Sequence, residues 1–283
     1  EPSIVGILIK SVELDKDEIS IVIRIPRSSI LPHRITIDTK GTKSKKNTFW
    51  VRGSGQKHEP DIFELRQLFN MSYGYKKRIQ ELRTDRLSKI NSGDVPVQLN
   101  SQPFLVIHLF PFSIDDMQFV ISLDYIRNNL NFFNPPRREI EHYWIDFDGF
   151  VGITNKYRWD TLQNSYIRIF HTGEVELVIG IGRSDINIDK IADDIIFSTQ
   201  NYLNCLFNLG IQPPISCAVS LLNTKGWEFR DKNKNYCMKS NRNQYNLPII
   251  NFDIIPKNNE ECRKHLSPIY NRMANIIGKA NFE

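Results

Sequence analysis

A strict alternation of isoleucines constrains the fold of this 283-residue chain most strongly. Isoleucine occupies positions 19, 21, 23 and 25, with Ser20, Val22 and Arg24 between them. Because successive side chains of a strand point to opposite faces, this spacing predicts a β-strand that buries its isoleucine face and ends before Pro26. Residues 4–12 form a second apolar run, and the acidic segment 13–18 predicts a hairpin between the two.

The loop after this strand carries side chains that suit a phosphate group. It contains Arg27, Ser28, His33 and Arg34. Arginine binds phosphate through two parallel charge-assisted hydrogen bonds, and hydroxyl groups add further donors. The sequence therefore predicts that this loop contributes to a binding site for a polyanion.

A second strand end leads to the same prediction. The aromatic segment 49–51 predicts a short strand, and Arg52 and a turn with Ser54 between two glycines follow it. Pro60 suits the first turn of a helix, and the apolar residues within 62–69 give that helix one apolar stripe. Backbone N–H groups at a helix N-terminus favour anions, so Arg52 and Ser54 join the predicted site.

Further basic side chains are expected to surround this site. They are Lys43, Lys45, Lys46, Lys77 and Arg78. Residues 1–90 contain 18 Lys and Arg against 11 Asp and Glu, whereas residues 91–283 contain 19 against 21. This asymmetry favours DNA or RNA as a partner, although each lysine cluster alone is also typical of ordinary solvated surface.

Two further features of this region have alternative interpretations. Trp50 is interpreted first as a core side chain of its strand and second as a platform on which a base stacks. Residues 75–91 predict a second helix, in which Glu81 and Asp85 have the spacing for ion pairs with residues four positions away. Its charged faces are either plain solvent-exposed surface or part of the polyanion site.

Several segments in order resemble a known family. The strings IRIPRSSILPHR, FWVR and DIFELRQLF resemble the second half of the Schlafen AlbA-like domain, which occurs in many bacterial proteins described as DNA-binding or ATP-binding. The resemblance continues in RIQELRTDRLSKINSGDVPVQL, FLVIHLFPF, YIRIFHTGEVELV and LPIINFDIIP. It covers most of the chain except residues 113–160.

The resemblance implies a nucleic-acid-binding protein with a role in nucleic-acid processing, regulation or defence against phage. In Schlafen-like nucleases the catalytic carboxylates lie in the first half of the domain, and this chain begins at Glu1 in what resembles its middle. We therefore expect a fragment or processed piece, with any nuclease carboxylates and their divalent metal outside this sequence. The chain itself has no GxxxxGK[ST] phosphate loop, so no ATP or other cofactor is expected in it.

The remaining sequence predicts an α+β fold. The continuous apolar run 104–110 predicts a central strand covered on both faces, with His108 in the core. Hairpins are predicted over 143–152 and 166–179, and helices over 187–210 and 259–278. A cluster of Gly, Pro and Ser near 93–102 predicts a partial Schlafen AlbA-like domain over 1–95 and a larger α+β domain with a mixed or antiparallel sheet over 96–283.

Little else in this region indicates chemistry. Glu174 and Glu176, two positions apart on a predicted strand, are interpreted as a solvent-facing edge, with a metal-binding carboxylate pair as the alternative. The four cysteines lack the spacing of a zinc site and are expected to be reduced. No apolar run approaches the roughly 20 residues of a membrane span, so a cytoplasmic protein is expected.

These observations leave two classes of function. The first is a nucleic-acid-binding and nucleic-acid-processing protein, either alone or as a nuclease whose missing half is another chain. The second is a protein-interaction or effector-sensing subunit of a larger complex, formed with further copies or with a partner protein and without catalysis of its own.

Overall fold

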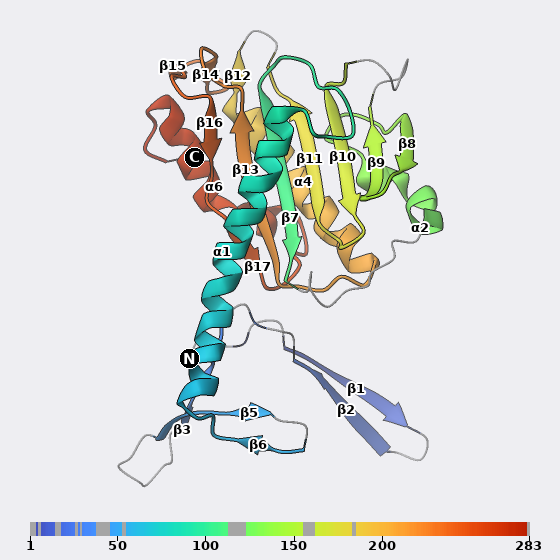
Figure 1. The fold of residues 1–283 in the computed structure, drawn as a ribbon, viewed down its shortest axis with the longest axis vertical. Coiled ribbons are helices and arrows are strands. Elements are labelled where there is room, and N and C mark those ends of the chain that lie inside the picture. The colour runs from blue at the N-terminus through green and yellow to red at the C-terminus, as the bar shows by residue number, and fades with distance from the viewer. Residues whose placement is uncertain are drawn as a thin grey trace. The chain divides into compact units, whose positions relative to one another are not determined.

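A computed structural model gives the fold of the chain (Figure 1). It describes residues 4, 7–14, 18–25, 28, 30–37, 46–52, 55–112, 123–154, 162–182 and 185–281. The chain divides into two compact units, Glu1–Leu82 and Arg83–Glu283, and the division falls within the long helix α1 (Ile62–Ser92). The sequence-based domain boundary after residue 95 stays a prediction.

Short antiparallel strand pairs and the first part of α1 form the N-terminal unit. The pairs are β1 (Leu8–Leu14) with β2 (Glu18–Arg24), β3 (Arg34–Ile37) with β4 (Lys46–Phe49), and β5 (Val51–Arg52) with β6 (Lys57–His58). The first pair confirms the predicted hairpin, but the predicted burial of its isoleucine face is wrong, because Ile19, Ile21, Ile23 and Ile25 are exposed. The rings of Phe49 and Phe69 meet edge to face at 6.4 Å between centroids, so the end of β4 lies against α1.

Helix α1 replaces the two helices that the sequence predicts. Its N-terminus is a capping box, in which Oδ1 of Asp61 accepts the N–H groups of Phe63 and Glu64 at 2.8 Å and the Glu64 carboxylate accepts the N–H of Asp61 at 3.0 Å. Pro60 therefore precedes the cap, so the prediction that it lies in the first turn of the helix is wrong. Gly74 does not end the helix, because one glycine costs only about 1 kcal/mol relative to alanine.

An eight-stranded antiparallel sheet forms the C-terminal unit. Its strands run in the order β16-β13-β7-β11-β10-β9-β8, and β17 pairs with one end of β13. Their bounds are β7 (Phe104–Pro111), β8 (His142–Ile145), β9 (Gly149–Ile153), β10 (Ser165–Phe170), β11 (Val175–Gly180), β13 (Ile215–Leu222), β16 (Gln244–Asn246) and β17 (Ile250–Phe252). The predicted α+β class is therefore correct, and the sheet is antiparallel.

Strand β7 has the central position that its apolar run predicts. It lies between β13 and β11 and is buried along its whole length. Leu105, Ile107 and Leu109 belong to the large core beneath α4 (Ile188–Asn208), whereas Phe104 and Val106 belong to a smaller core with the last turns of α1. Figure 1 shows α4 and these last turns of α1 on opposite faces of the sheet. The strand is apolar throughout because both of its faces are covered.

Several smaller elements complete this unit. They are α2 (Leu123–Asn128), α3 (Leu130–Phe133), β12 (Ile186–Asn187), β14 (Glu228–Arg230), β15 (Cys237–Lys239), α5 (Asn259–His265), α6 (Ser267–Ala274) and a 3-10 turn, η1 (Asn275–Ile277). The single helix predicted over 259–278 is thus wrong. It is interrupted at Leu266, because Pro268 has no N–H to donate to a carbonyl one turn earlier.

In the part of the chain that the structure describes, no helix has the length and apolar character of a membrane span. The four cysteines are free thiols, and Cys237 alone among them is exposed.

The turn at Asp148-Gly149 gives a stability prediction. Gly149 has φ +153°, and a Cβ atom there would overlap the carbonyl oxygen of Ile169 and approach Cα of Phe170 to 2.9 Å. We expect Gly149→Ala to lower the free energy of unfolding by about 3 kcal/mol, since the neighbouring backbone cannot move aside. Urea denaturation followed by circular dichroism measures the difference.

Gly226→Ala is the matched control for this substitution. Gly226 also has a positive φ, +86°, but nothing lies within 4 Å of the place that a Cβ atom would take there. Its substitution is expected to cost only the backbone strain of about 1–2 kcal/mol. Equal losses in the two variants would contradict the steric argument.

Candidate functional site

Trp50 lies at the surface of the N-terminal unit, between β4 and β5. Its side chain is 39% exposed, and its indole N–H donates to Oγ1 of Thr48 at 3.1 Å. Nζ of Lys57 lies 5.3 Å from the ring centroid, within the range of a cation–π interaction. The interpretation of Trp50 as a core side chain is therefore wrong, and its ring is held at the surface in a defined orientation.

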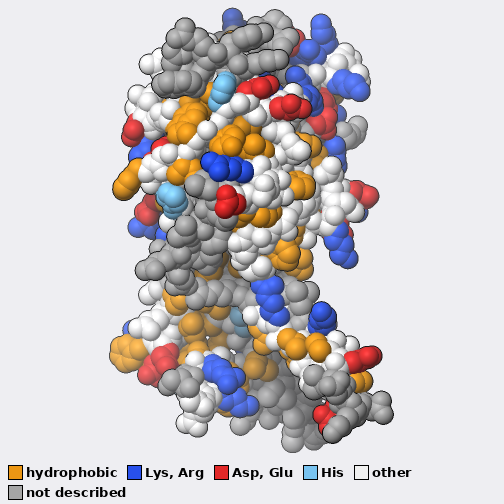
Figure 2. Space-filling model, turned by 90° about the vertical axis from the view of Figure 1, so that its right-hand side faces the viewer, with side chains coloured by type: hydrophobic (Ala, Val, Ile, Leu, Met, Phe, Trp, Pro, Cys, Tyr) orange, Lys and Arg blue, Asp and Glu red, His pale blue; other side chains and the backbone are white. Residues whose placement is uncertain are grey.

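Basic side chains accompany this ring. Arg52 and Lys57 are register partners of β5 and β6, and both are exposed. Arg34 is the register partner of Phe49, and because adjacent side chains of a strand point to opposite faces, this pairing does not place Arg34 beside Trp50. Figure 2 shows basic and hydrophobic side chains next to each other on the surface of the N-terminal unit. The strand ends thus present an indole and cations together, which suits bases and phosphates.

The N-terminus of α1 does not contribute to this surface as predicted. The carboxylate of Asp61 occupies the N–H groups of Phe63 and Glu64, which the sequence suggested would favour an anion. Nε2 of His58 lies 2.9 Å from Oε1 of Glu64. This hydrogen bond, together with the one from the N–H of Asp61, lowers the pKa of Glu64. The helix end is therefore satisfied by acidic groups of its own chain.

The structure places only some of the predicted binding residues. Arg27, Lys43, Lys45 and Ser54 lie outside the described residues, and Lys46 is described only through its backbone, as the first residue of β4.

Among the predicted residues that are described, local roles differ. The Ser28 hydroxyl accepts the N–H of Ile30 at 3.2 Å and so belongs to a local turn. His33 and Arg34 are half-buried at the start of β3. Arg52 is exposed beside Trp50. Of the two helix residues, Arg78 is half-buried and Lys77 is exposed, with its ammonium group 3.7 Å from Oε1 of Glu81. Among the predicted cations, Arg52 is thus the one linked to the indole: it is two residues from Trp50 and pairs with Lys57, which lies over the ring.

Sequence reasoning missed Lys57. Its signal was the turn Gly53-Ser54-Gly55, which follows Arg52 and allows the chain to fold back as a hairpin. A hairpin whose loop is residues 53–56 pairs Lys57 with Arg52, so the sequence could have identified this pair.

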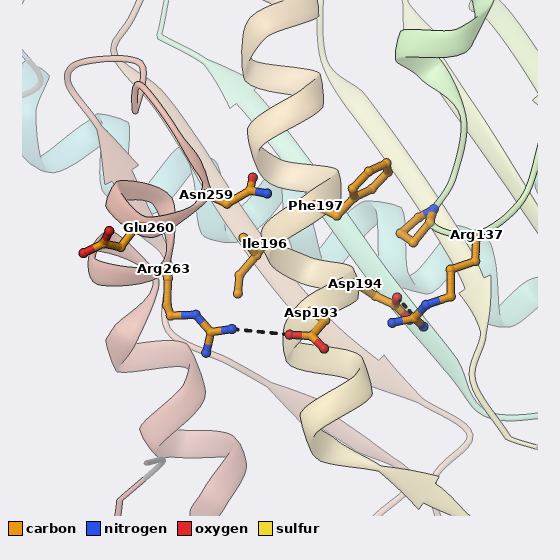
Figure 3. Close-up of a pocket in the computed structure, with 9 residues that line it drawn as sticks. Arg137, Asp193, Asp194, Ile196, Phe197, Asn259, Glu260 and Arg263 are labelled. Carbon is orange, nitrogen blue, oxygen red and sulfur yellow. Dashed lines mark hydrogen bonds and ion pairs between the residues drawn. The ribbon is translucent and has the colours of Figure 1, made fainter. Parts of the chain in front are cut away.

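A pocket of about 500 Å³ lies in the C-terminal unit, between α4, α5 and the loop before β8 (Figure 3). Two ion pairs border it: Arg137 to Asp194 at 2.8 Å and Arg263 to Asp193 at 3.3 Å. The exposed ring of Phe197 forms part of the wall. Burial raises the pKa of Asp194 to about 6, although Arg137 acts in the opposite direction. The pocket has polar and aromatic walls, but its charged groups are paired with one another.

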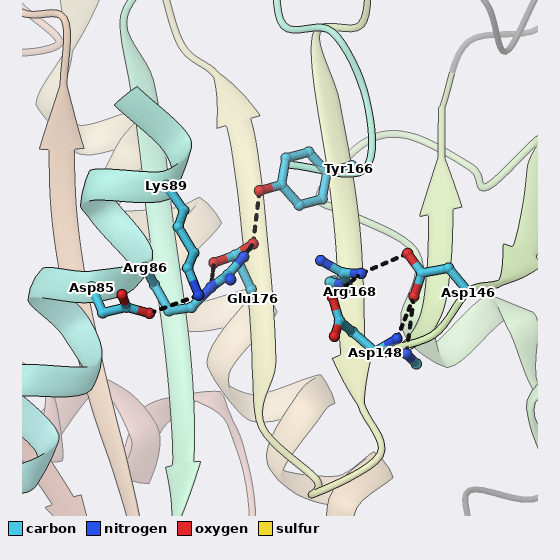
Figure 4. Close-up of polar contacts among 9 residues, drawn as sticks. Asp85, Arg86, Lys89, Asp146, Asp148, Tyr166, Arg168 and Glu176 are labelled. Carbon is cyan, nitrogen blue, oxygen red and sulfur yellow. Dashed lines mark hydrogen bonds and ion pairs between the residues drawn. The ribbon is translucent and has the colours of Figure 1, made fainter. Parts of the chain in front are cut away.

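A second cluster of charged groups is buried between the sheet and the last turns of α1 (Figure 4). The carboxylate of Glu176 on β11 accepts two hydrogen bonds from Arg86 at 2.8 Å, one from the hydroxyl of Tyr166 at 2.7 Å and one from Nε2 of His108 at 3.0 Å. Burial alone raises the pKa of Glu176, but His108 and Arg86 outweigh it and lower the value to about 2. Every hydrogen-bonding position of this ionised carboxylate is filled, which indicates a structural role.

Both interpretations of the pair Glu174 and Glu176 are therefore wrong. Glu176 is fully buried. Glu174 precedes β11 and accepts a hydrogen bond from the hydroxyl of Thr172. They do not form a solvent-facing edge or a carboxylate pair. The prediction that His108 is a hydrogen-bonded core residue is confirmed.

No group of three or more His, Cys, Asp or Glu that could hold a metal ion occurs among the described residues. A scan against protein-family models finds no match, and searches of curated proteins and of solved structures find no similar chain.

The Glu176 cluster gives a second stability prediction. Glu176→Gln leaves the Arg86 guanidinium without its counter-charge, so we expect the free energy of unfolding at pH 7 to fall by about 3 kcal/mol. The matched control is Glu81→Gln, because Glu81 pairs with Lys77 in an exposed position, and such pairs contribute less than about 0.5 kcal/mol. Urea denaturation of both variants measures the difference.

The pH dependence provides a further check on the same variant. Because the pKa of Glu176 is lowered to about 2 in the fold, its contribution is complete above the ordinary carboxyl pKa and is lost as the pH falls towards 2. The wild type is expected to lose more stability over this window than Glu176→Gln. Parallel pH profiles would contradict the assignment of an ionised buried carboxylate.

Proposed function

We propose that this chain binds nucleic acid through the strand surface of its N-terminal unit, as a protein of the Schlafen AlbA-like kind. The observation that carries the proposal is the surface indole of Trp50, with Lys57 against its ring and Arg52 opposite Lys57 in the strand pair. Proteins that hold unpaired nucleic acid combine aromatic rings, on which bases stack, with cations that contact the backbone.

The distribution of charge supports this proposal. Residues 24–78 contain 13 Lys and Arg against 4 Asp and Glu. Two of these four acids, Asp61 and Glu64, are engaged in the helix cap and with His58. Few carboxylates of this segment therefore compete with phosphate for its cations, and a basic stretch of this kind attracts nucleic acid at long range.

The resemblance to the Schlafen AlbA-like domain supports the same function and suggests a role in nucleic-acid processing. Nuclease activity is proposed only for an assembly that also contains the first half of that domain, because the family's catalytic carboxylates lie there. The carboxylates and the divalent metal would come from that half, and this chain would supply the binding surface.

A second candidate function is effector sensing by the C-terminal unit. The pocket beside α4 favours it, because an exposed aromatic ring and two arginines border one concave surface. A bound molecule would have to compete with the ion pairs to Asp193 and Asp194, which favours a ligand that carries charges of its own.

The stacking role of Trp50 is tested by the fluorescence anisotropy of labelled single-stranded DNA, hairpin RNA and duplex DNA. Base–aromatic stacking contributes about 1–3 kcal/mol per base, so we expect Trp50→Ala to weaken binding to unpaired strands roughly tenfold or more. Phe147→Ala is the matched control, since Phe147 is 96% exposed in the turn between β8 and β9. Equal effects of the two substitutions would contradict the stacking role of Trp50.

The cation role is tested with a double variant, Arg52→Ala/Lys57→Ala. Each lost phosphate contact should reduce the slope of log K against log salt by about 0.7 on a single strand. The matched control is Lys225→Ala/Lys257→Ala, which removes two exposed lysines from the C-terminal unit. If no nucleic acid binds, or if both double variants behave alike, the proposed surface is wrong.

A further inference from the structure

The hairpin β1–β2 exposes an apolar face. Its register pairs Ile9 with Ile23, Ser11 with Ile21 and Glu13 with Ile19, which places the isoleucines on one face. Ile9, Ile19, Ile21 and Ile23 are each between 57% and 70% exposed. An isolated two-stranded hairpin is marginally stable in water, and an exposed apolar patch of this kind marks an interaction surface.

One edge of strand β2 is also open in the described part of the chain. Within the described part of the chain, β2 pairs with β1 alone. The other edge of β2 thus carries backbone N–H and C=O groups that can form a further ladder, and such an edge is a template for pairing with another strand. The apolar face and the open edge belong to the same strand.

The sequence of β2 complements itself when it is read in the opposite direction. β2 is EISIVIR, with Glu18 at its first position and Arg24 at its last. In an antiparallel pair of two copies centred on Ile21, Glu18 of each copy lies opposite Arg24 of the other, and Ile19 lies opposite Ile23. Opposite charges and β-branched side chains directly across from each other stabilise a sheet.

Other arrangements lose this complementarity. A parallel pair in register places Glu18 against Glu18 and Arg24 against Arg24, and like charges directly opposite are destabilising. An antiparallel pair shifted by two residues towards the end of the strand places Glu18 opposite Pro26, and proline has no N–H for a ladder. The charges therefore select the antiparallel direction, and Pro26 disfavours this shifted register.

We propose that β2 pairs antiparallel with β2 of a second copy of this chain, centred on Ile21. The product is a four-stranded sheet, β1–β2–β2–β1, in which the isoleucines of the two β2 strands lie next to each other on one face. Four strands exceed the number that a sheet with an apolar face needs for independent stability. The contact is isologous, because the same strand edge is used twice, so it closes at two copies. The pairing uses none of the residues assigned to the nucleic-acid surface and does not depend on that function.

Sedimentation velocity of the full chain over a range of concentrations tests the proposal. The wild type is expected to form a dimer. Glu18→Arg and Arg24→Glu each place like charges opposite each other at both ends of the new ladder, and each is expected to weaken dimerisation about tenfold. The double variant Glu18→Arg/Arg24→Glu restores opposite charges and is expected to regain the dimer. Lys10→Glu, an exposed charge reversal on β1, is the matched control and should leave dimerisation unchanged.

Cross-linking tests the register. Residues directly opposite each other in an antiparallel pair have Cα atoms about 4.5–5.5 Å apart, which suits a disulfide. In a Cys237→Ser background, which removes the exposed thiol, Ile21→Cys should form a covalent dimer when diamide takes up the two thiol hydrogens. Ile9→Cys, equally exposed but on β1, should not.

The following results would overturn the proposal. They are a monomer at every concentration, a dimer that the single charge reversals leave intact, and covalent dimers that form from Ile9→Cys as readily as from Ile21→Cys. Open-ended assemblies larger than a dimer would also contradict it, because an isologous contact closes at two copies.

Discussion

The C-terminal unit depends on a carboxylate that its own sheet buries. Glu176 lies on β11 with His108 opposite it on β7 and Arg168 opposite it on β10, so the three side chains stand in one row across the sheet. An ionised carboxylate is costly to bury without donors, and the sheet supplies two of them, His108 and Tyr166. The positive counter-charge comes from Arg86 on α1. This contact fixes where the last turns of the helix lie on the sheet.

The same row of side chains also positions the hairpin β8–β9 at the edge of the sheet. Arg168 pairs with Asp146 at 2.6 Å and with Asp148 at 2.7 Å, and both aspartates lie in the turn between β8 and β9. Its guanidinium and that of Arg86 both lie over the ring of Phe170. The helix and the turn are thus fixed by one polar layer, while the apolar side chains around it provide most of the burial.

Sequence reasoning found the features whose signals are local. Period-two alternation predicted the hairpin of residues 8–24, and a strand end with a glycine-flanked turn identified Arg52. It failed where a partner is distant in sequence, since Glu176 looked like a surface residue because Arg86 is ninety residues away. Whether Trp50 faces solvent depends on what covers its strand, and the spacing of residues in the sequence does not show this. The predicted anion site at the helix N-terminus was wrong for another reason. Asp61 and Glu64 could have been recognised as a capping box, which uses the N–H groups that an anion would need.

The two units use isoleucine in opposite ways, and the difference is that α4 covers the isoleucine face of the larger sheet. Ile107, Ile167 and Ile169 are completely buried in an eight-stranded sheet covered by α4, whereas the isoleucines of β2 stay exposed on a two-stranded one. Pairing of β2 between copies would give each assembly two Trp50 surfaces. Two linked sites bind one polyanion more tightly than either alone if the strand spans both. Loss of the pairing would then weaken binding to long strands while leaving binding to short ones unchanged, which connects the assembly of the N-terminal unit to its proposed function.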